Sequence, residues 1–241
     1  MGKKVIIIGA SSGIGKELAR VFSAHDFTVG LTARRVELLQ ELQKDLPSSS
    51  FIKYMDLNDT ASSIKVLHEL IKEMGEVDII VINAGAGKDN PVLEWEKEKL
   101  SIDVNVSGFT SMAVTATNYF IERKKGHIVG ISSVAAIRPF RLCPAYGASK
   151  AFISFYLRGL RNKFVKHGFK DIYVTDIKPG FVATDMTKNN DRMFWVATAE
   201  KAANQIYDAI IAKKKEVFIT RRWRIAAFIM RILPDFIYNR I

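Results

Sequence analysis

Cysteine is almost absent from this chain of 241 residues. The single Cys143 has no partner for an internal disulfide, which indicates a reducing compartment such as the cytoplasm. A reactive thiol is a second interpretation of Cys143, but a small packing residue is the commoner role of an isolated cysteine. We therefore expect one domain held by its hydrophobic core, for which a hydrophobic content of 48% is sufficient.

Long apolar runs are missing as well. No stretch reaches the ~18 apolar residues that a transmembrane helix requires. Lys3 and Lys4 precede an apolar run, as in a signal peptide, but the run at 5–8 is too short for one. Ile6 occupies the place where a myristoylation signal has serine or threonine. The sequence also lacks a linker, a repeat and a low-complexity tract.

Short apolar stretches alternate with stretches of helical periodicity. This pattern predicts an α/β fold, a Rossmann-like doubly wound parallel sheet of about seven strands with helices on both faces, whose ligands bind beyond the carboxyl ends of the strands. Strands are predicted at 4–8, 27–32, 51–55, 77–82, 127–132, 171–177 and 216–219. The clearest helices are predicted at 13–24, 36–46, 59–74, 105–124, 147–167 and 199–212.

A glycine-rich turn follows the first predicted strand. Backbone N–H groups in such a turn can approach a pyrophosphate at the positive end of a helix, and helical periodicity follows directly. The glycines have three and then one residue between them, unlike the usual dinucleotide fingerprint. The turn predicts a dinucleotide site that contains Gly9, Ser11, Ser12, Gly13, Ile14 and Gly15.

Tyr146 and Lys150 lie four residues apart in a predicted helix, so their Cβ atoms are roughly 5–6 Å apart on one face. A phenol has a reference pKa of about 10 and is a poor base at neutral pH unless a cation stabilises its anion. Lys150 supplies that cation, and Ser133 at the end of an apolar segment can hold a substrate oxygen against the phenol. The alternative is two unrelated residues on a helix surface.

These stretches together resemble the short-chain dehydrogenase/reductase family, over nearly the whole chain from Lys4 to about Thr220. The resemblance implies a cofactor-binding catalytic domain at 1–220, and we expect 221–241 to be an extension of it. Beside the glycine turn, the matching residues are Asp56-Leu57 for adenine, Asn83-Ala84-Gly85, the tetrad Asn105, Ser133, Tyr146 and Lys150, and Pro179-Gly180 with Val182 and Thr184 around the nicotinamide. Asp56 also suits a turn or a helix cap.

The resemblance implies a role for each residue of the tetrad. Tyr146 is the general acid that protonates a carbonyl oxygen, and the base in the reverse direction. Lys150 lowers the pKa of the tyrosine and hydrogen-bonds the nicotinamide ribose, while Asn105 holds a water that links Lys150 to solvent. Ser133 orients the substrate oxygen and stabilises its developing charge. Ser132 is the alternative for this role, although the family's spacing favours Ser133.

The residues after the second predicted strand favour NADP over NAD. An acidic residue there would bind the ribose 2′-hydroxyl of NAD and repel a 2′-phosphate, but the sequence has Ala33, Arg34 and Arg35. Arginine binds phosphate through a planar fork of donors. We expect NADP(H), with Arg34 as the leading contact and Arg35 or Ser12 assisting. The alternative is that both arginines form a solvated helix start.

Two segments are expected to contact the substrate. Their residues are Ile137, Arg138, Phe140, Arg141, Leu142 and Cys143 before the tyrosine, and Met186, Met193, Phe194 and Trp195 in the segment that forms a flexible lid in relatives. An apolar, methionine-bearing lid suits a hydrophobic, lipid-like carbonyl better than a sugar or a small acid. The alternatives are core or subunit contacts for the apolar residues, and solvated charges rather than a substrate contact for the arginines.

The C-terminus carries much of the net charge. From Lys213 onward there are eight basic and two acidic residues, in a chain whose net charge is +11. Apolar residues recur with helical spacing at Ile225, Phe228, Ile229 and Ile232. A basic amphipathic helix of this kind fits peripheral contact of residues 221–241 with an anionic membrane. The alternative is that this helix covers the sheet edge or a neighbouring subunit.

The sequence therefore predicts an NADP-dependent oxidoreductase that interconverts an alcohol and a carbonyl. The rival hypothesis is a nucleotide-binding sensor or scaffold of the same fold with little turnover, because fold and motifs do not certify activity. Relatives form homodimers or homotetramers through the helices that correspond to 105–124 and 147–167. We expect no metal site and, because no nucleic-acid motif accompanies the basic charge, no nucleic-acid partner.

Overall fold

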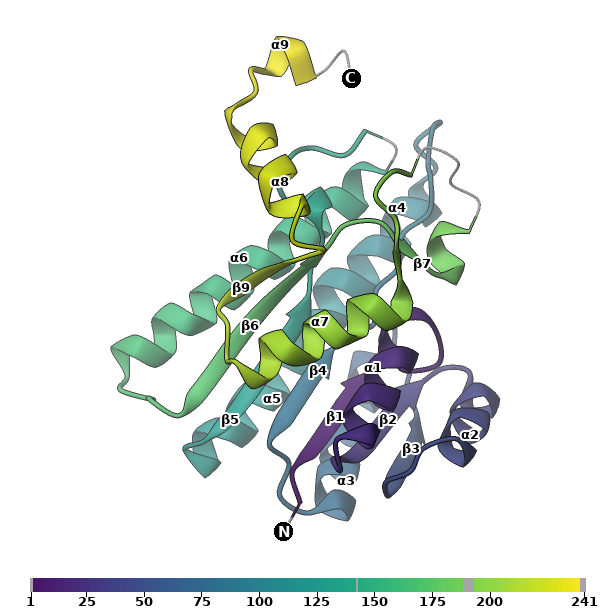
Figure 1. The fold of residues 1–241 in the computed structure, drawn as a ribbon, viewed down its shortest axis with the longest axis vertical. Coiled ribbons are helices and arrows are strands. Elements are labelled where there is room, and N and C mark those ends of the chain that lie inside the picture. Colours follow the sequence, from purple (N-terminus) through teal and green to yellow (C-terminus); the bar gives the residue numbers. More distant parts are fainter. Residues whose placement is uncertain (1, 142, 189–192, 239–241) are drawn as a thin grey trace.

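The computed structural model describes residues 2–141, 143–188 and 193–238. Seven parallel strands form one sheet in the order β3-β2-β1-β4-β5-β6-β9 (Figure 1), which confirms the predicted Rossmann-like fold. The strands are β1 (Lys4–Ile8), β2 (Thr28–Ala33), β3 (Ser50–Tyr54), β4 (Ile79–Ile82), β5 (Gly126–Ile131), β6 (Ile172–Pro179) and β9 (Glu216–Ile219). A separate two-stranded pair consists of β7 (Val182–Ala183) and β8 (Ala197–Thr198).

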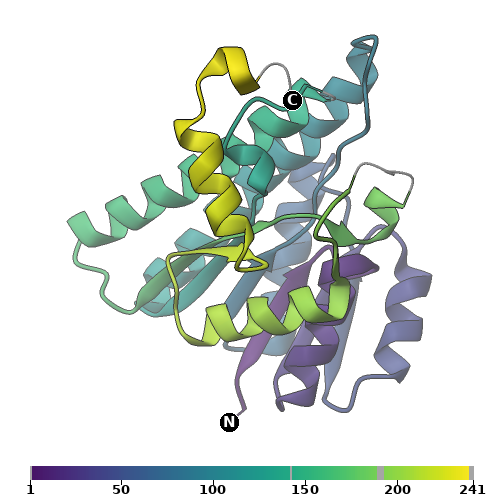
Figure 2. The ribbon, with the colours of Figure 1, turned by 45° about the horizontal axis from the view of Figure 1, so that its top comes forward.

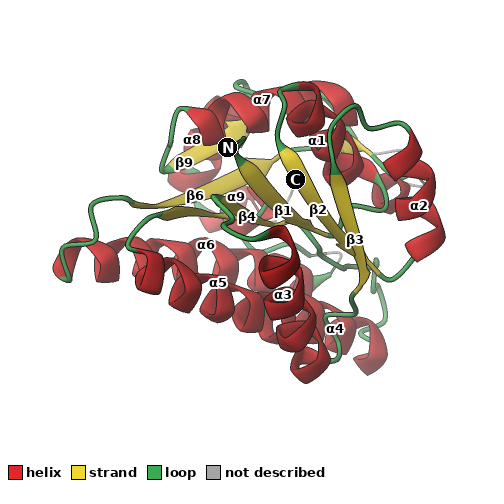
Figure 3. Ribbon diagram, turned by 90° about the horizontal axis from the view of Figure 1, so that it is seen from below, coloured by secondary structure: helices red, strands yellow, loops and turns green. Residues whose placement is uncertain are grey.

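Helices cover both faces of the sheet (Figure 3). One face carries α1 (Gly13–Ala24), α2 (Val36–Lys44) and α7 (Ala199–Ile211), and the other carries α3 (Thr60–Met74), α5 (Phe109–Arg123) and α6 (Pro144–Lys166). Two hydrophobic cores result, because successive side chains of a strand point to opposite faces. Val5 and Ile7 of β1 pack in one core with Phe22, whereas Ile6 and Ile8 pack in the other.

The order in which strands are added reverses at the middle of the sheet, between β1 and β4. β1 pairs with β2 on one side and with β4 on the other, and all of these strands are parallel. The turns after β1 and β4 therefore lead away from each other at the carboxyl ends of the strands. This divergence is the topological switch point at which doubly wound folds bind their ligands.

A helix between β4 and α5 was not predicted from the sequence. Helix α4 (Trp95–Ile102) precedes a π-helical turn, η1 (Asp103–Gly108), so α5 begins at Phe109 instead of 105. Within α4 only Ser101 is buried. Half of its eight residues are charged and it lacks a clear apolar stripe, which is why periodicity did not reveal it.

The C-terminal segment extends past the carboxyl ends of the strands as α8 (Trp223–Ile232) and α9 (Asp235–Tyr238) (Figure 2). It contacts the loop after β5: Arg138 donates from Nε to the carbonyl of Met230 at 2.7 Å, and the Tyr238 hydroxyl donates to the carbonyl of Pro139 at 2.9 Å. Among the described residues, no helix is both long and apolar enough to cross a membrane.

A buried ion pair lies within the sheet, beneath the carboxyl ends of the strands. Asp176 and Lys178 on β6 are almost fully buried and form an ion pair. The carboxylate also accepts hydrogen bonds from Ser132 at 2.5 Å and Ser154 at 2.7 Å, while Lys178 lies 3.4 Å from Glu216. The pair is therefore fixed on both sides by groups from three neighbouring elements.

We expect Lys178→Met to destabilise the protein by about 3–5 kcal/mol, because it leaves the Asp176 carboxylate buried without its cation. Urea unfolding followed by circular dichroism measures this loss. Lys53→Met is the matched control, because Lys53 pairs with Glu73 at the surface and its loss should change stability little. Equal unfolding midpoints for the two variants would contradict the prediction.

Candidate active site

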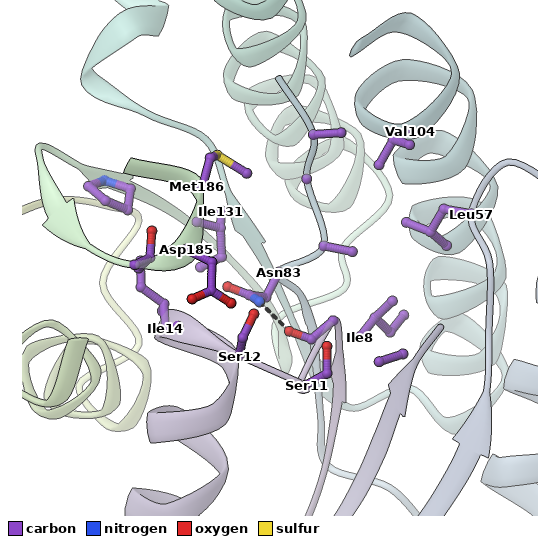
Figure 4. Close-up of a pocket in the computed structure, with 18 of the residues that line it drawn as sticks. Ile8, Ser11, Ser12, Ile14, Leu57, Asn83, Val104, Ile131, Asp185 and Met186 are labelled. Carbon is purple, nitrogen blue, oxygen red and sulfur yellow. Dashed lines mark hydrogen bonds between the residues drawn. The ribbon is translucent and has the colours of Figure 1, made fainter. Parts of the chain in front are cut away.

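A cavity of about 320 Å³ opens at the carboxyl ends of the central strands. Its walls come from the β1–α1 turn, the ends of β2, β3, β4 and β5, helix α6 and the segment after β6. Figure 4 shows Ser11 and Ser12 on the glycine turn, Val104 and Leu57 on one wall, and Asp185 near Ser12. The cavity thus joins the predicted glycine turn to Ser133, Tyr146 and Lys150 of the predicted tetrad.

The glycine turn requires residues without side chains. Gly9 has a φ of +92° and Gly13 a φ of +55°, in the left-handed region that glycine favours. A Cβ on Gly9 would lie 2.7 Å from the backbone of Ala84, and one on Gly15 would lie 2.1 Å from the carbonyl oxygen of Gly9. Asn83 donates from Nδ2 to that carbonyl at 2.6 Å (Figure 4), so the turns after β1 and β4 are joined.

The first turn of α1 is open to an anion. Ser12 is the N-cap residue but makes no side-chain capping bond, and no acidic residue occupies the first turn. The N–H groups at this terminus carry the positive end of the helix dipole. Ser12, Gly13 and Ile14 line the cavity, so the turn fits a pyrophosphate group, as a dinucleotide requires.

Two arginines lie beside the glycine turn. Arg35 donates to Ser12 Oγ at 2.8 Å and to Ser11 Oγ at 3.3 Å, and it lies 3.8 Å from the Asp185 carboxylate. Arg34 also lines the cavity and is exposed. The structure therefore brings Arg35, more than Arg34, into contact with the serines of the turn.

Asp56 and Leu57, the two residues predicted to contact adenine, follow β3 and both line the cavity. The Asp56 carboxylate accepts hydrogen bonds from the backbone and the side-chain amide of Asn58 at 3.1 Å and 2.9 Å, as in an Asx turn. Leu57 packs on Gly108, where a Cβ would lie 2.6 Å from the leucine Cβ. Asp56 thus forms a turn while also bordering the cavity.

Tyr146 and Lys150 project from the first turns of α6. The Lys150 Nζ lies 5.7 Å from the centre of the Tyr146 ring and donates to the carbonyl of Ile131 at 3.0 Å. Burial lowers the pKa of Lys150 to about 8, while the Asp176 charge opposes this shift. Burial also raises the pKa of Tyr146, against a hydrogen bond with Ser133 that lowers it.

The two serines after β5 differ in their contacts. Ser132 donates its hydroxyl to the Asp176 carboxylate and to the carbonyl of Ile177, so its proton points into the protein. Ser133 accepts from the backbone N–H of Ala135 at 3.0 Å and forms the hydrogen bond with Tyr146. Both border the cavity, but only Ser133 is directed toward the phenol.

Asn105 lies behind the cavity, in the π-helical turn. Its Oδ1 accepts from the N–H of Ala86 at 2.8 Å, and its Nδ2 donates to the carbonyl of Ala86 at 2.7 Å and to Ser149 at 2.9 Å. Ser149 is the residue before Lys150 on α6. The side chain therefore holds the segment after β4 against the helix that carries the tyrosine and the lysine.

The segment after β6 closes the remaining side. Pro179, Gly180, Val182 and Thr184 line the cavity, and a Cβ on Gly13 would lie 2.9 Å from the Thr184 methyl group. Thr184 and Thr187 form a reciprocal capping box at a short 3₁₀ turn, η3 (Asp185–Thr187). This segment thus lies directly across from the glycine turn.

Two residues of the site escaped the sequence analysis. Gly87 packs on the Tyr146 ring, where a Cβ would lie 2.4 Å from ring atom Cδ2. The second glycine after Asn83-Ala84, at position 87, was the only sequence signal for this contact. Glu98 on α4 accepts from the backbone N–H of Ala145 at 2.7 Å, which caps α6 at its start; no sequence signal indicates this long-range cap.

The loop before the tyrosine lies between the site and the C-terminal segment. Phe140 stacks edge-on against Tyr146 with ring centres 6.3 Å apart. Cys143 is buried with its Sγ near Glu98, in agreement with a packing role. Arg138 pairs with Asp235 of the C-terminal segment, and the predicted substrate residue Leu142 lies outside the described residues. No three His, Cys, Asp or Glu side chains gather as a metal site within the described ranges.

Comparison with known proteins identifies the family. The family of short chain dehydrogenases matches residues 3–194. The chain belongs to the short-chain dehydrogenase/reductases. It is an oxidoreductase of that family and is 29% identical to an uncharacterised oxidoreductase of Myxococcus xanthus over 243 residues, which cover 98% of this chain and 95% of that protein.

Solved structures of this family share the fold. A short-chain dehydrogenase from Sphingobium yanoikuyae in complex with NADPH superimposes with a TM-score of 0.80 at 22% identity, over 97% of each chain. A short-chain dehydrogenase/reductase from Burkholderia phymatum in complex with NAD gives a TM-score of 0.86 at 17% identity, over 95% of this chain and 92% of that chain. At these identities the likeness establishes the fold alone.

Proposed function

We propose that this protein interconverts an alcohol and a ketone or aldehyde with NADP(H) as its cofactor. One observation carries the proposal: Tyr146, Lys150 and Ser133 line one end of the cavity whose other end is the glycine turn. A hydride carrier bound along the turn would have its reacting end near the phenol. The cofactor, when bound, supplies or accepts the hydride.

The residues at the tyrosine end handle the proton. Tyr146, whose pKa burial raises, holds its proton at neutral pH and donates it to the carbonyl oxygen during reduction. Ser133 donates a hydrogen bond to the same oxygen and stabilises its developing charge. Lys150 is mostly protonated at neutral pH, and its charge favours the phenolate that remains. Asn105 positions the helix that carries both residues, and we retain the prediction that it helps hold a water beside Lys150.

The cofactor preference rests on the end of β2. Ala33 stands where an acidic residue would bind the 2′-hydroxyl of NAD, and Arg35 is held beside Ser11 and Ser12 by hydrogen bonds. Arg34 adds a second guanidinium at the same rim of the cavity. Two cations beside the glycine turn favour a 2′-phosphate, which supports NADP(H). Asp56 and Leu57 are proposed to border the adenine.

The substrate is proposed to be a hydrophobic carbonyl or alcohol. Phe140, which packs against the ring of Tyr146, and Met186, which lines the cavity, are apolar residues that could contact such a substrate. We further propose a homodimer or homotetramer formed through α5 and α6, because Phe155 and Val165 on α6 are large, apolar and exposed. A reducing compartment such as the cytoplasm agrees with the free, buried Cys143.

Cofactor titration tests the preference. We expect NADPH to bind at least about tenfold tighter than NADH, a difference of ~1.4 kcal/mol, as followed by fluorescence. Arg35→Ala should remove most of this difference, and Arg34→Ala part of it. Arg20→Ala is the matched control, because Arg20 pairs with Glu17 away from the cavity. Equal affinity of the wild type for both cofactors would show that the preference is wrong.

Tyr146→Phe tests the enzyme against a non-catalytic nucleotide sensor. The variant keeps the ring that packs on Gly87 and loses only the proton donor. We expect carbonyl reduction by NADPH to fall by roughly 10²–10⁴-fold, while NADPH affinity changes little. A panel of ketones and aldehydes, assayed by NADPH absorbance, measures the rate. No turnover by the wild type, with intact NADPH binding, would favour the sensor.

The pH profile of reduction tests the role of Lys150. Its pKa of about 8 predicts that kcat/KM for NADPH falls as the pH rises through about 8, because the free protein loses the lysine charge. Asp176 raises the pKa of Lys150, so Asp176→Asn, which keeps the size of the side chain and removes its charge, should move this fall to lower pH. A fall that stays in place in the variant would refute this electrostatic role.

A further inference from the structure

Helix α8 leaves most of its apolar face uncovered. Trp223 and Ala227 are its only buried residues in the described structure. Ile225, Phe228 and Ile232 are 64%, 63% and 64% exposed, and Phe236 of α9 is 67% exposed. Ile225, Phe228 and Ile232 recur at i, i+3 and i+7 and so share one side of α8, which no described part of this chain covers. We call this side of α8, together with Phe236 of α9, the α8–α9 face. The intramolecular alternative left open by the sequence therefore does not account for these side chains.

Arginines border the α8–α9 face. Arg221, Arg222 and Arg224 are exposed at the start of α8, and Arg231 lies near its end. The lysines before β9 do not belong to this surface. Lys213 lies over the ring of Tyr173, with its Nζ 3.9 Å from the ring centre, near the amino end of β6. The basic charge beside the apolar side chains of the α8–α9 face therefore comes from the arginines of α8 and of the residues just before it.

The α8–α9 face continues onto the rim of the cavity. The Arg222 guanidinium lies 5.4 Å from the Trp195 ring centre, and Trp223 contacts Trp195 and Phe194 at 5.8 Å and 5.1 Å between ring centres. Phe194 and Trp195 are themselves partly exposed. Met186, another exposed apolar residue, lines the cavity itself. Exposed apolar residues thus extend from α8 to the cavity wall.

Two occupants could cover such a surface: a second copy of this chain or a lipid bilayer. In a symmetric dimer the same patch meets itself, so the arginines of both copies would be brought together. Asp235, the acidic residue of α9, is already paired with Arg138 and is not available to neutralise the arginines of a second copy. An anionic bilayer accepts apolar side chains into its interface and neutralises arginines at the level of its headgroups. The charge of the face therefore favours the bilayer.

We propose that the α8–α9 face docks this protein on the surface of an anionic lipid bilayer. Phe228 and Ile232 enter the interface, the arginines at the start of α8 contact lipid phosphates, and the cavity opens beside the membrane. A membrane-dissolved carbonyl would then reach the site without crossing bulk water. Docking itself does not depend on the proposed reaction and can be measured without turnover.

Vesicle co-sedimentation of the full chain tests docking. We expect it to sediment with vesicles of equal phosphatidylcholine and phosphatidylglycerol, and only weakly with phosphatidylcholine alone. Phe228→Asp combined with Ile232→Asp should reduce binding by more than about tenfold, because charged residues do not enter the interface. Replacing Arg221, Arg222 and Arg224 by Gln should reduce binding to anionic vesicles by more than about tenfold and weaken its salt dependence.

Matched variants away from the α8–α9 face control for lost charge and lost apolar surface. Ile211→Asp changes an exposed apolar residue at the end of α7, and Lys44, Lys65 and Lys72 replaced by Gln remove three exposed cations on α2 and α3. These variants should bind as the wild type does. The proposal is overturned if the wild type stays in the supernatant, or if the control variants lose binding equally. It is also overturned if Phe228→Asp combined with Ile232→Asp changes only the mass measured by sedimentation equilibrium. NADPH affinity, measured in parallel, reports separately on the proposed function.

Discussion

The close contact between the turns after β1 and β4 is the constraint on which the rest of the site depends. Gly9 touches the backbone of Ala84, and Asn83 binds the carbonyl of Gly9. No side chain separates these two backbones, and beyond the contact the two turns lead away from each other, which leaves a crevice at the middle of the sheet. Every other wall of the cavity is positioned relative to this point, including the helix that carries Tyr146.

A second constraint is electrostatic. Lys150 is held in a buried place that disfavours its charge, and Asp176 on the neighbouring strand opposes that effect. Asp176 is in turn balanced by Lys178, which reaches Glu216 at the edge strand. Arg231 of α8 lies 3.8 Å from the same glutamate. A continuous series of charges therefore runs from beneath the tyrosine to the C-terminal segment.

The sequence predicted the sheet and the motif residues because short apolar runs and glycine spacing are local signals. Where the signal is weak the prediction failed. Helix α4 was not predicted because half of its residues are charged, and α5 begins four residues later than predicted because a π-helical turn precedes it. Side-chain directions could not be predicted, since Arg35 and Arg138 are placed by contacts with Ser12 and Asp235 far away in the chain. The same holds for Lys213, which sequence proximity grouped with the arginines of α8 but the fold separates from them.

The boundary expected after residue 220 does not separate two independently packed parts of the structure. Trp223 is 4% exposed and lies on Gly180, where a Cβ would be only 2.0 Å from its Nε1. Its ring also packs against Phe181 and Phe194. The first turn of the extension therefore covers the segment after β6 that lines the cavity. A chain shortened at residue 220 would uncover that segment and lose its support. Truncation there would therefore disturb the nucleotide pocket and the surface beyond it together, and only point substitutions can separate the two.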